Sequence, residues 1–207
     1  ALGVAIACLP PVVPAIGSRR LAYVNLGVGF AEGGNHEAAA NFYRKAIALA
    51  PRVAAPHRDL AVALIALGRS GEAAAELQTA LRLDPSQSST AANLGGVALA
   101  QGRGEEAAGW YRKAIALEPG QSHYHYQLSV ALADLGRIDE AAQELETTLR
   151  LDPGSAAAHD DLGVMLARRG DLAGAERHFR EAYRIDPERP STLFNLGGVA
   201  MGQGRAD

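Results

Sequence analysis

Proline recurs at a fixed interval of 34 residues along most of this 207-residue chain. Each of these prolines closes a near-copy of one phrase, in the order AIALAP, ALRLDP, AIALEP, TLRLDP and AYRIDP. The five prolines are Pro51, Pro85, Pro119, Pro153 and Pro187. Self-similarity at a fixed period of about 20–50 residues is the signature of a repeat protein, in which each unit contacts only its neighbours. The chain is therefore expected to be built from stacked copies of one unit.

Three more positions stay in phase with proline when the repeats are counted from residue 20. Position 7 is leucine, position 15 is glycine and position 20 is alanine in every copy that reaches them. The apolar spacing between glycine and proline is helical, which predicts a helix A, a turn and a helix B in each repeat. Glycine supplies the left-handed turn after helix A, and proline ends helix B because it cannot continue a helix. The predicted repeats are 20–53, 54–87, 88–121, 122–155 and 156–189, with a half-repeat at 190–207.

Small residues at positions 8 and 20 allow helices A and B to approach closely, and a larger residue at position 24 fills the space between them. Position 24 is Tyr43, Leu77, Tyr111, Leu145 and Phe179. This pattern resembles the tetratricopeptide repeat (TPR) family. The resemblance implies an all-α fold, a right-handed superhelical solenoid of antiparallel helix pairs. Position 4 departs from the tryptophan that the family favours, and the departure is expected to loosen local packing. Position 4 holds Tyr23, His57, Ala91, His125, His159 and Leu193.

The resemblance also implies a concave groove lined by positions 2, 5, 6, 9, 12 and 13 of each helix A. These positions are largely apolar here, and exposed apolar patches usually mark interaction surfaces. Position 6 is polar in every repeat, and a side-chain amide can pair with any peptide backbone because it both donates and accepts. The row resembles the asparagine ladder of the transferase that adds N-acetylglucosamine to proteins; the alternative is a polar position that simply faces water. The expected partner-binding residues are Asn25, Asp59, Asn93, Gln127, Asp161, Asn195, Val28, Val62, Tyr126, Val130 and Phe194.

Other function classes find little support in the sequence. The formal net charge of −3 argues against nucleic acid as a partner, which would require a basic stripe. The six histidines are expected to be packing residues, and the single cysteine, Cys8, excludes a cysteine metal site within one chain. Val24 and Val28 stand where family members that clamp a C-terminal carboxylate carry lysine and asparagine, so no clamp is expected. We expect no enzyme activity, no cofactor and no metal.

The two ends of the sequence leave alternatives open. Residues 1–19 begin with an uncharged apolar stretch outside the repeats, which is either a packed extended tail or the remnant of a membrane or signal segment. The last predicted helix, at 190–205, is apolar all round, so both ends are expected to be uncapped. All but two of the 20 Lys and Arg residues are Arg, a composition typical of a GC-rich bacterial genome. An extracytoplasmic or membrane-attached location is favoured over a cytoplasmic one.

Three functions are consistent with these features. The first is a protein-interaction scaffold that binds an extended peptide or a partner helix in its groove. The second is a structural subunit that assembles head to tail into a filament through its uncapped ends and the N-terminal tail. The third is a TPR appendage of a membrane glycosyltransferase-like protein. The expected partner is a protein or peptide, or another copy of the same chain.

Overall fold

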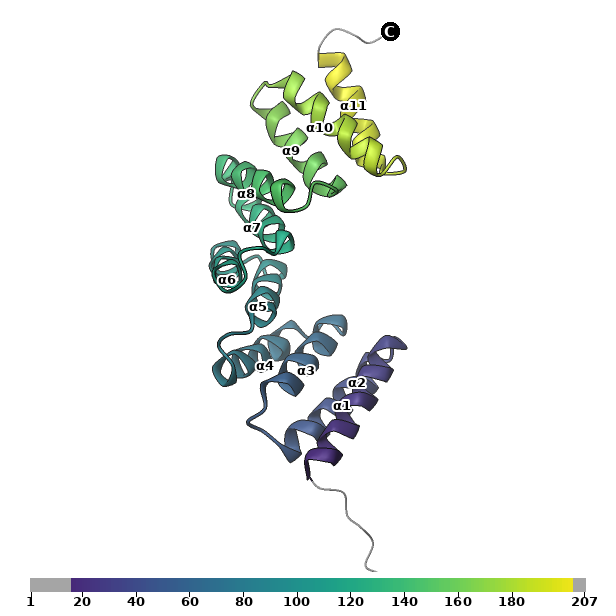
Figure 1. Cartoon of the computed structure of the whole chain (residues 1–207), viewed down its shortest axis with the longest axis vertical. Coiled ribbons are helices and arrows are strands. Elements are labelled where there is room, and N and C mark those ends of the chain that lie inside the picture. Colours follow the sequence, from purple (N-terminus) through teal and green to yellow (C-terminus); the bar gives the residue numbers. More distant parts are fainter. Residues whose placement is uncertain (1–15, 203–207) are drawn as a thin grey trace, which may run out of the picture. The chain divides into compact units, whose positions relative to one another are not determined.

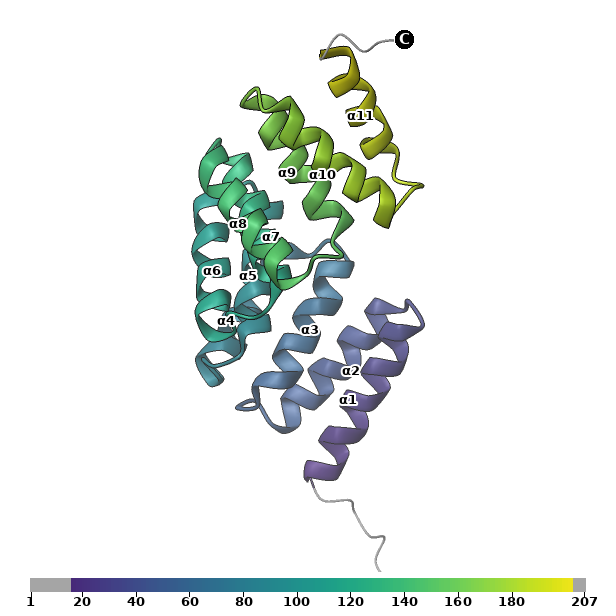
Figure 2. The same cartoon turned by 45° about the horizontal axis from the view of Figure 1, so that its top comes forward.

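A computed structural model describes residues 16–202, and this part of the chain forms eleven α-helices and no strand (Figure 1). The helices alternate as helix A and helix B, and the two helices of a repeat lie antiparallel and side by side (Figure 2). The A helices are α1 (Ile16–Glu32), α3 (Ala54–Ala66), α5 (Ser88–Ala100), α7 (Ser122–Asp134), α9 (Ala156–Arg168) and α11 (Pro190–Gly202). The B helices are α2 (His36–Leu49), α4 (Ser70–Leu83), α6 (Gly104–Leu117), α8 (Ile138–Leu151) and α10 (Leu172–Ile185). The all-α prediction is confirmed.

The helices form two compact units, which are described separately. Helices α1–α4 make up the first unit and α5–α11 the second. Within each unit every helix packs on the next one, and in the second unit α9 also contacts α11 directly. Most of the tail predicted at 1–19 lies outside the described residues, while residues 16–19 form the first turn of α1. Helix A of the first repeat is therefore longer at its start than the repeat pattern indicates.

Each predicted glycine turn within the described residues has a left-handed backbone. Their φ angles are 76°, 72°, 72°, 74° and 85° at Gly34, Gly68, Gly102, Gly136 and Gly170. The residue after each glycine donates a backbone hydrogen bond to the carbonyl five residues earlier, as Arg103 does to Ala98 at 2.9 Å. This bond closes a Schellman motif, which requires φ > 0 at the glycine. The glycines at position 15 therefore set where each helix A ends.

Packing between helices A and B follows a rule of paired sizes at positions 8 and 24. Where position 8 is glycine, position 24 is aromatic, and a Cβ placed on Gly95 would lie 2.8 Å from Cε1 of Tyr111. The same close approach occurs at Gly27 with Tyr43 and at Gly163 with Phe179. The remaining two repeats combine alanine or serine with leucine instead. The expected close approach of the two helices is thus achieved in two alternative ways.

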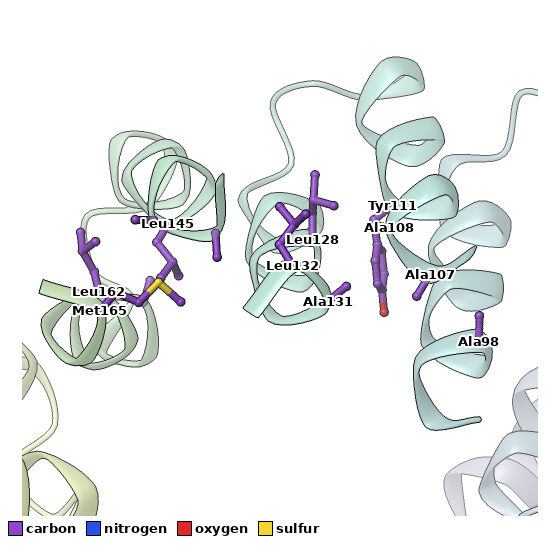
Figure 3. Packing of buried hydrophobic residues seen from close by; sticks show 13 residues of the cluster. Ala98, Ala107, Ala108, Tyr111, Leu128, Ala131, Leu132, Leu145, Leu162 and Met165 are labelled. Atoms are coloured by element: carbon purple, nitrogen blue, oxygen red, sulfur yellow. The ribbon is translucent and has the colours of Figure 1, made fainter. Parts of the chain in front are cut away.

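The core of the second unit includes an apolar seam, made mostly of alanine and leucine, that runs from α5 to α9. Alanines at positions 20 and 27 are almost completely buried, among them Ala107 and Ala114 at 0% exposure. Leu128 and Leu162 at position 7 are 2% and 3% exposed and lie between successive helices. Figure 3 shows Ala107, Leu128 and Leu162, with Tyr111, pointing into the spaces between successive helices. Each repeat therefore completes its core with residues of its neighbour.

The expected loosening at position 4 is not what the structure shows in the repeats that carry histidine. His57 is 7% exposed, with Nδ1 2.6 Å from a carboxylate oxygen of Glu76 and Nε2 donating to the Pro51 carbonyl oxygen at 3.0 Å. His125 repeats the arrangement with Glu144 and Pro119. Histidine at position 4 therefore ties helix B of its own repeat to the proline that follows helix B of the preceding repeat. The prediction that these histidines pack rather than ligate is consistent with this geometry.

The last full repeat replaces the carboxylate with a second histidine. Nδ1 of His159 lies 3.0 Å from Nδ1 of His178, and Nε2 of His159 donates to the Pro153 carbonyl oxygen at 3.3 Å. One Nδ1 must donate and the other accept, so the two facing nitrogens share a single proton. Burial, followed by the charge that His159 carries when protonated, lowers the pKa of His178. This contact is therefore sensitive to acid.

Candidate peptide-binding face

The inner face of the second unit is formed by positions 2, 5, 6, 9, 12 and 13 of its A helices. It carries apolar side chains that are half-buried or exposed, including Val130, Val164 and Phe194, of which Phe194 is 81% exposed. Position 6 contributes one polar side chain from each of the four A helices, and all four are partly accessible. Those side chains are Asn93, Gln127, Asp161 and Asn195. Apolar surface and polar groups thus alternate on the face that the sequence indicates.

The position-6 side chains of this unit are not equivalent. Asn195 donates through Nδ2 to Asp160 Oδ1 at 3.2 Å, and Asp161 accepts from the Tyr126 hydroxyl at 2.8 Å. Asn93 and Gln127 have no hydrogen-bond partner within residues 16–202. Two amides therefore remain free for a ligand, whereas two polar groups of the row already hold neighbouring repeats together.

Asp160, which is only 3% exposed, anchors α11 to α9. Its Oδ2 accepts from the Ser191 hydroxyl at 2.6 Å and lies 3.5 Å from Nε of Arg189. Together with the bond from Asn195, these contacts fix three side chains at the start of α11. The sequence shows Asp160 only as a charge on the inner face, because its role depends on side chains 29–35 residues further along.

Burial and charge alter the acidity of the neighbouring pair. Burial first, and then the Asp161 carboxylate, raise the pKa of Tyr126 to about 12. Burial also raises the pKa of Asp161, although the hydrogen bond from Tyr126 acts in the opposite direction. The Tyr126 hydroxyl is therefore a donor across the whole physiological pH range, and it holds α7 against α9.

Two pockets open on the same inner face. The first, of about 330 Å³, lies between α9 and α11 with α10 beneath it. It is lined by Val164, Ala167, Arg168, Leu172, Phe179, Phe194, Asn195, Gly198 and Val199. The second, of about 210 Å³, lies between α7 and α9 with Ile138 of α8 contributing to its wall. It is lined by Ser129, Val130, Ala133, Asp134, Ile138, Asp161, Val164, Met165 and Arg168.

The first unit presents the remaining predicted residues. Val28 and Val62 are 39% and 50% exposed on the inner faces of α1 and α3. Asn25 is exposed and has no hydrogen-bond partner within the described residues. Asp59 accepts from the Arg58 guanidinium, which is its neighbour on the same helix, at 3.0 Å. This unit therefore offers one free amide and two accessible valines.

The sequence identifies Arg168 only as one of the few charges on the inner face, and it does not reveal the residues that form the pocket floors. Leu172, Phe179 and Ile138 belong to B helices, which the family pattern does not place in the groove. Arg168 occupies position 13, where other repeats have Glu32, a small residue or Asp134. A comparison of position 13 across the repeats would have singled it out.

No helix among residues 16–202 combines the length and apolar character needed to cross a bilayer. Within the same described residues, no group of three His, Cys, Asp or Glu side chains is arranged to hold a metal ion.

The helix pairs, left-handed glycine turns and alanine-rich contacts define a tetratricopeptide repeat protein. Within this class, residues 12–206 match the Cilia and flagella-associated protein 70 C-terminal domain, and the chain belongs to this TPR family. A sequence comparison with curated proteins gives no match.

Solved TPR structures share the fold at low sequence identity. Pseudomonas aeruginosa pilF superposes with a TM-score of 0.81 at 24% identity, over 92% of this chain and 88% of that one. MamA from Desulfovibrio magneticus RS-1 gives 0.77 at 21% identity, over 85% of this chain and 99% of that one. YrrB, described as a TPR protein with an unusual peptide-binding site, gives 0.71 at 23% identity, over 84% and 90%. These likenesses confirm the TPR solenoid fold.

Proposed function

We propose that the chain is a non-catalytic protein-interaction scaffold that binds an extended peptide or a partner helix on the inner face of its A helices. The proposal rests on the position of both pockets, which open on this face of the second unit. Concave, mostly apolar pockets with a few placed polar groups are typical of binding sites. The likeness to YrrB, whose description names a peptide-binding site, is consistent with this function.

The free amides on the same face supply the second element of recognition. Asn93 and Gln127 each offer a donor and an acceptor that no described residue uses. Pairing with a peptide backbone would make binding tolerant of sequence, while the pockets select side chains. In the first unit, Asn25, Val28 and Val62 are proposed to contribute in the same way. The other position-6 residues, Asp59, Asp161 and Asn195, are proposed to shape the face through their internal contacts.

Selection of displayed random peptides on the 207-residue chain tests this function. Peptides that bind should lose affinity when Val164, which lines both pockets, is changed to Glu. The matched control is Ala173→Glu, because Ala173 is exposed on α10 outside both pockets. Circular dichroism establishes that both variants remain folded. Equal binding by the two variants, or no selected peptide at all, would contradict a binding role for this face.

The amides can be tested with the same selected peptides. Replacing Asn93 or Gln127 with alanine should weaken binding roughly 2- to 10-fold each, the effect expected for one hydrogen bond. Gln143→Ala is the control, since Gln143 is an exposed amide on α8, a B helix. Equal affinity for all three variants would show that these amides do not contact the ligand.

Self-association is a second candidate function, supported by the exposed apolar side chains of α1 and α11. Leu21 and Leu26 of α1 are 51% and 46% exposed, and Leu193 and Met201 of α11 are 51% and 67% exposed. In this proposal, α11 of one copy packs against α1 of the next. Sedimentation velocity should then show concentration-dependent assembly that Leu193→Glu abolishes. A monomer at every concentration would rule the assembly out.

A further inference from the structure

The two pockets of the second unit are successive copies of one site, displaced by one repeat. Residues 34 apart occupy equivalent places in their walls: Val130 corresponds to Val164, and Asp161 corresponds to Asn195. Further equivalent pairs are Ala133 with Ala167, Asp134 with Arg168, Ile138 with Leu172 and Met165 with Val199. Repetition of the repeat thus places two apolar pockets side by side on one face.

One substitution between the copies contributes to the difference in size between the pockets. Val164 projects into the smaller pocket from α9, whereas the equivalent position on α11 is Gly198. A Cβ built on Gly198 would meet no atom within 4 Å, so the missing side chain leaves open space. The α9–α11 pocket, which holds about 330 Å³, can therefore accept a bulkier apolar side chain than its neighbour can.

Arg168 lines both pockets and thus lies where they meet. Its side chain is exposed, and it makes no hydrogen bond or ion pair to any residue between 16 and 202. The next residue, Arg169, instead pairs with Asp139 of α8. A free guanidinium beside apolar surface is a preferred partner for a carboxylate, which it can bind through two parallel hydrogen bonds.

The other charges on this face determine on which side of Arg168 a carboxylate would lie. Asp134 and Asp161 line the smaller pocket, where they would repel a ligand carboxylate. Arg168 is the only charged residue among those that line the larger pocket. Asp160 and Arg189 pair with each other next to α11, and Asp160 also accepts from Ser191 and Asn195. A ligand carboxylate is therefore favoured on the α11 side of Arg168.

We propose that the inner face of the second unit binds a polypeptide segment in which a bulky apolar side chain stands next to an Asp or Glu. The apolar side chain fills the pocket between α9 and α11, and the neighbouring carboxylate binds Arg168. A second, smaller apolar side chain of the same segment occupies the pocket between α7 and α9. This inference rests on the proposed function, because it specifies the ligand of that same face.

Selection of displayed random peptides on the full chain and on three charge variants tests the inference. On the unaltered chain, the selected peptides should be enriched in Asp or Glu next to Phe, Leu, Met or Trp. Arg168→Gln should weaken the binding of these peptides about ten-fold, and Arg168→Glu should change the preferred charge from acidic to basic. Arg169→Gln is the matched control and should retain the acidic preference.

The outcomes separate this inference from the function on which it rests. Peptides that depend on Val164 but show no acidic preference, or keep one in Arg168→Glu, would overturn the inference while the binding role stands. If no selected peptide depends on Val164, the binding role fails and the inference fails with it. Loss of the acidic preference in Arg169→Gln to the same degree as in Arg168→Gln would also overturn it, since a general effect of surface charge would then explain both.

Discussion

The ring of Tyr111 lies directly on the backbone of Gly95, and a Cβ at Gly95 would be 2.8 Å from Cε1 of the ring. Tyr111 is 2% exposed and cannot move away without disturbing the seam between α5 and α6. Gly95→Ala should therefore lower the free energy of unfolding by about 1–3 kcal/mol, the usual cost of overpacking a core. Urea unfolding followed by circular dichroism measures the change.

Gly109→Ala provides the control for this substitution. Gly109 also lies inside a helix, α6, but it is exposed and a Cβ there would meet nothing within 4 Å. Alanine should stabilise that position by about 0.5–1 kcal/mol, because glycine is a poor residue for a helix interior. Equal stability of Gly95→Ala and Gly109→Ala would contradict a tight contact between Tyr111 and the backbone of Gly95.

A compensating change tests the rule of paired sizes more directly. The double variant Gly95→Ala/Tyr111→Leu reproduces the pair that Ala61 and Leu77 form in the repeat 54–87. It should recover about 1 kcal/mol or more relative to the sum of the two single variants, since contacting residues are coupled. Additive effects in a double-mutant cycle would show that the two positions are independent.

The pair of His159 and His178 predicts a specific loss of stability in acid. The pKa of His178 is lowered in the folded chain, so the unfolded chain binds a proton more readily and stability falls as the pH drops below about 6.5. His178→Glu would restore the histidine–carboxylate contact of the other repeats and should remove this component of the pH dependence. Unfolding free energies at pH 7.5 and 5.5 measure the effect.

The exposed His123 supplies a control for the acid effect. His123→Glu changes the same residue type on the surface of α7 and should leave the pH dependence of stability close to that of the unaltered chain. A pH profile of His178→Glu that matched that of His123→Glu would refute a role for the histidine pair.

Asp160 is predicted to control how firmly α11 is held. Asp160→Ala would remove the acceptor used by Ser191 and Asn195 and leave Arg189 without its partner, at a cost of about 1–3 kcal/mol. The loss should be local, because these contacts all lead to α11. Amide hydrogen exchange should become faster in α11 and stay nearly unchanged in α7.

Removing a carboxylate on the surface is the control for Asp160→Ala, because it shows whether the loss of any aspartate speeds exchange in α11. Asp139 is 86% exposed in its side chain and pairs with Arg169, so Asp139→Ala should alter exchange in α11 very little. Equal acceleration of α11 exchange in Asp139→Ala and Asp160→Ala would contradict the anchoring role.

Removing the hydroxyl of Thr192 should stabilise the folded chain. The residue is 0% exposed, and its Oγ1 has no hydrogen-bond partner within the described residues. A buried hydroxyl without a partner is costly, so Thr192→Val should raise the free energy of unfolding by about 1 kcal/mol. Thr148→Val is the contrast, because Thr148 Oγ1 donates to the Glu144 carbonyl at 2.9 Å. A more stable Thr148→Val than Thr192→Val would disprove this reasoning.

Much of the fold follows from the sequence because local rules fix the ends of the helices. Gly102 and Pro119 end α5 and α6 for reasons that depend only on backbone conformation, so their places could be predicted residue by residue. The pairing of His57 with Glu76 was also visible, since the same 19-residue spacing recurs at His125 and Glu144. The signal for this pair lies in the comparison of the chain's own repeats, and not in the family pattern, which favours tryptophan at position 4.

The chemistry of the inner face could be predicted from the sequence less completely than the fold. Position 6 is polar in all repeats, yet the side chain of Asn195 donates a hydrogen bond to Asp160, while that of Asn93 has no partner among the described residues. The difference depends on a neighbour at position 5 of the preceding repeat, which no periodic pattern specifies. The pocket between α9 and α11 likewise depends on the absence of a side chain at Gly198.

The most direct test of a binding role is NMR chemical-shift mapping of a selected peptide on the full chain. Shift changes should concentrate at inner-face residues such as Val130, Val164 and Asn195. Amides on the outer faces of the B helices, such as those of Gln143 and Arg180, should not move. Changes confined to the outer faces, or spread evenly over both, would contradict the proposal that the inner face of the A helices is the binding surface.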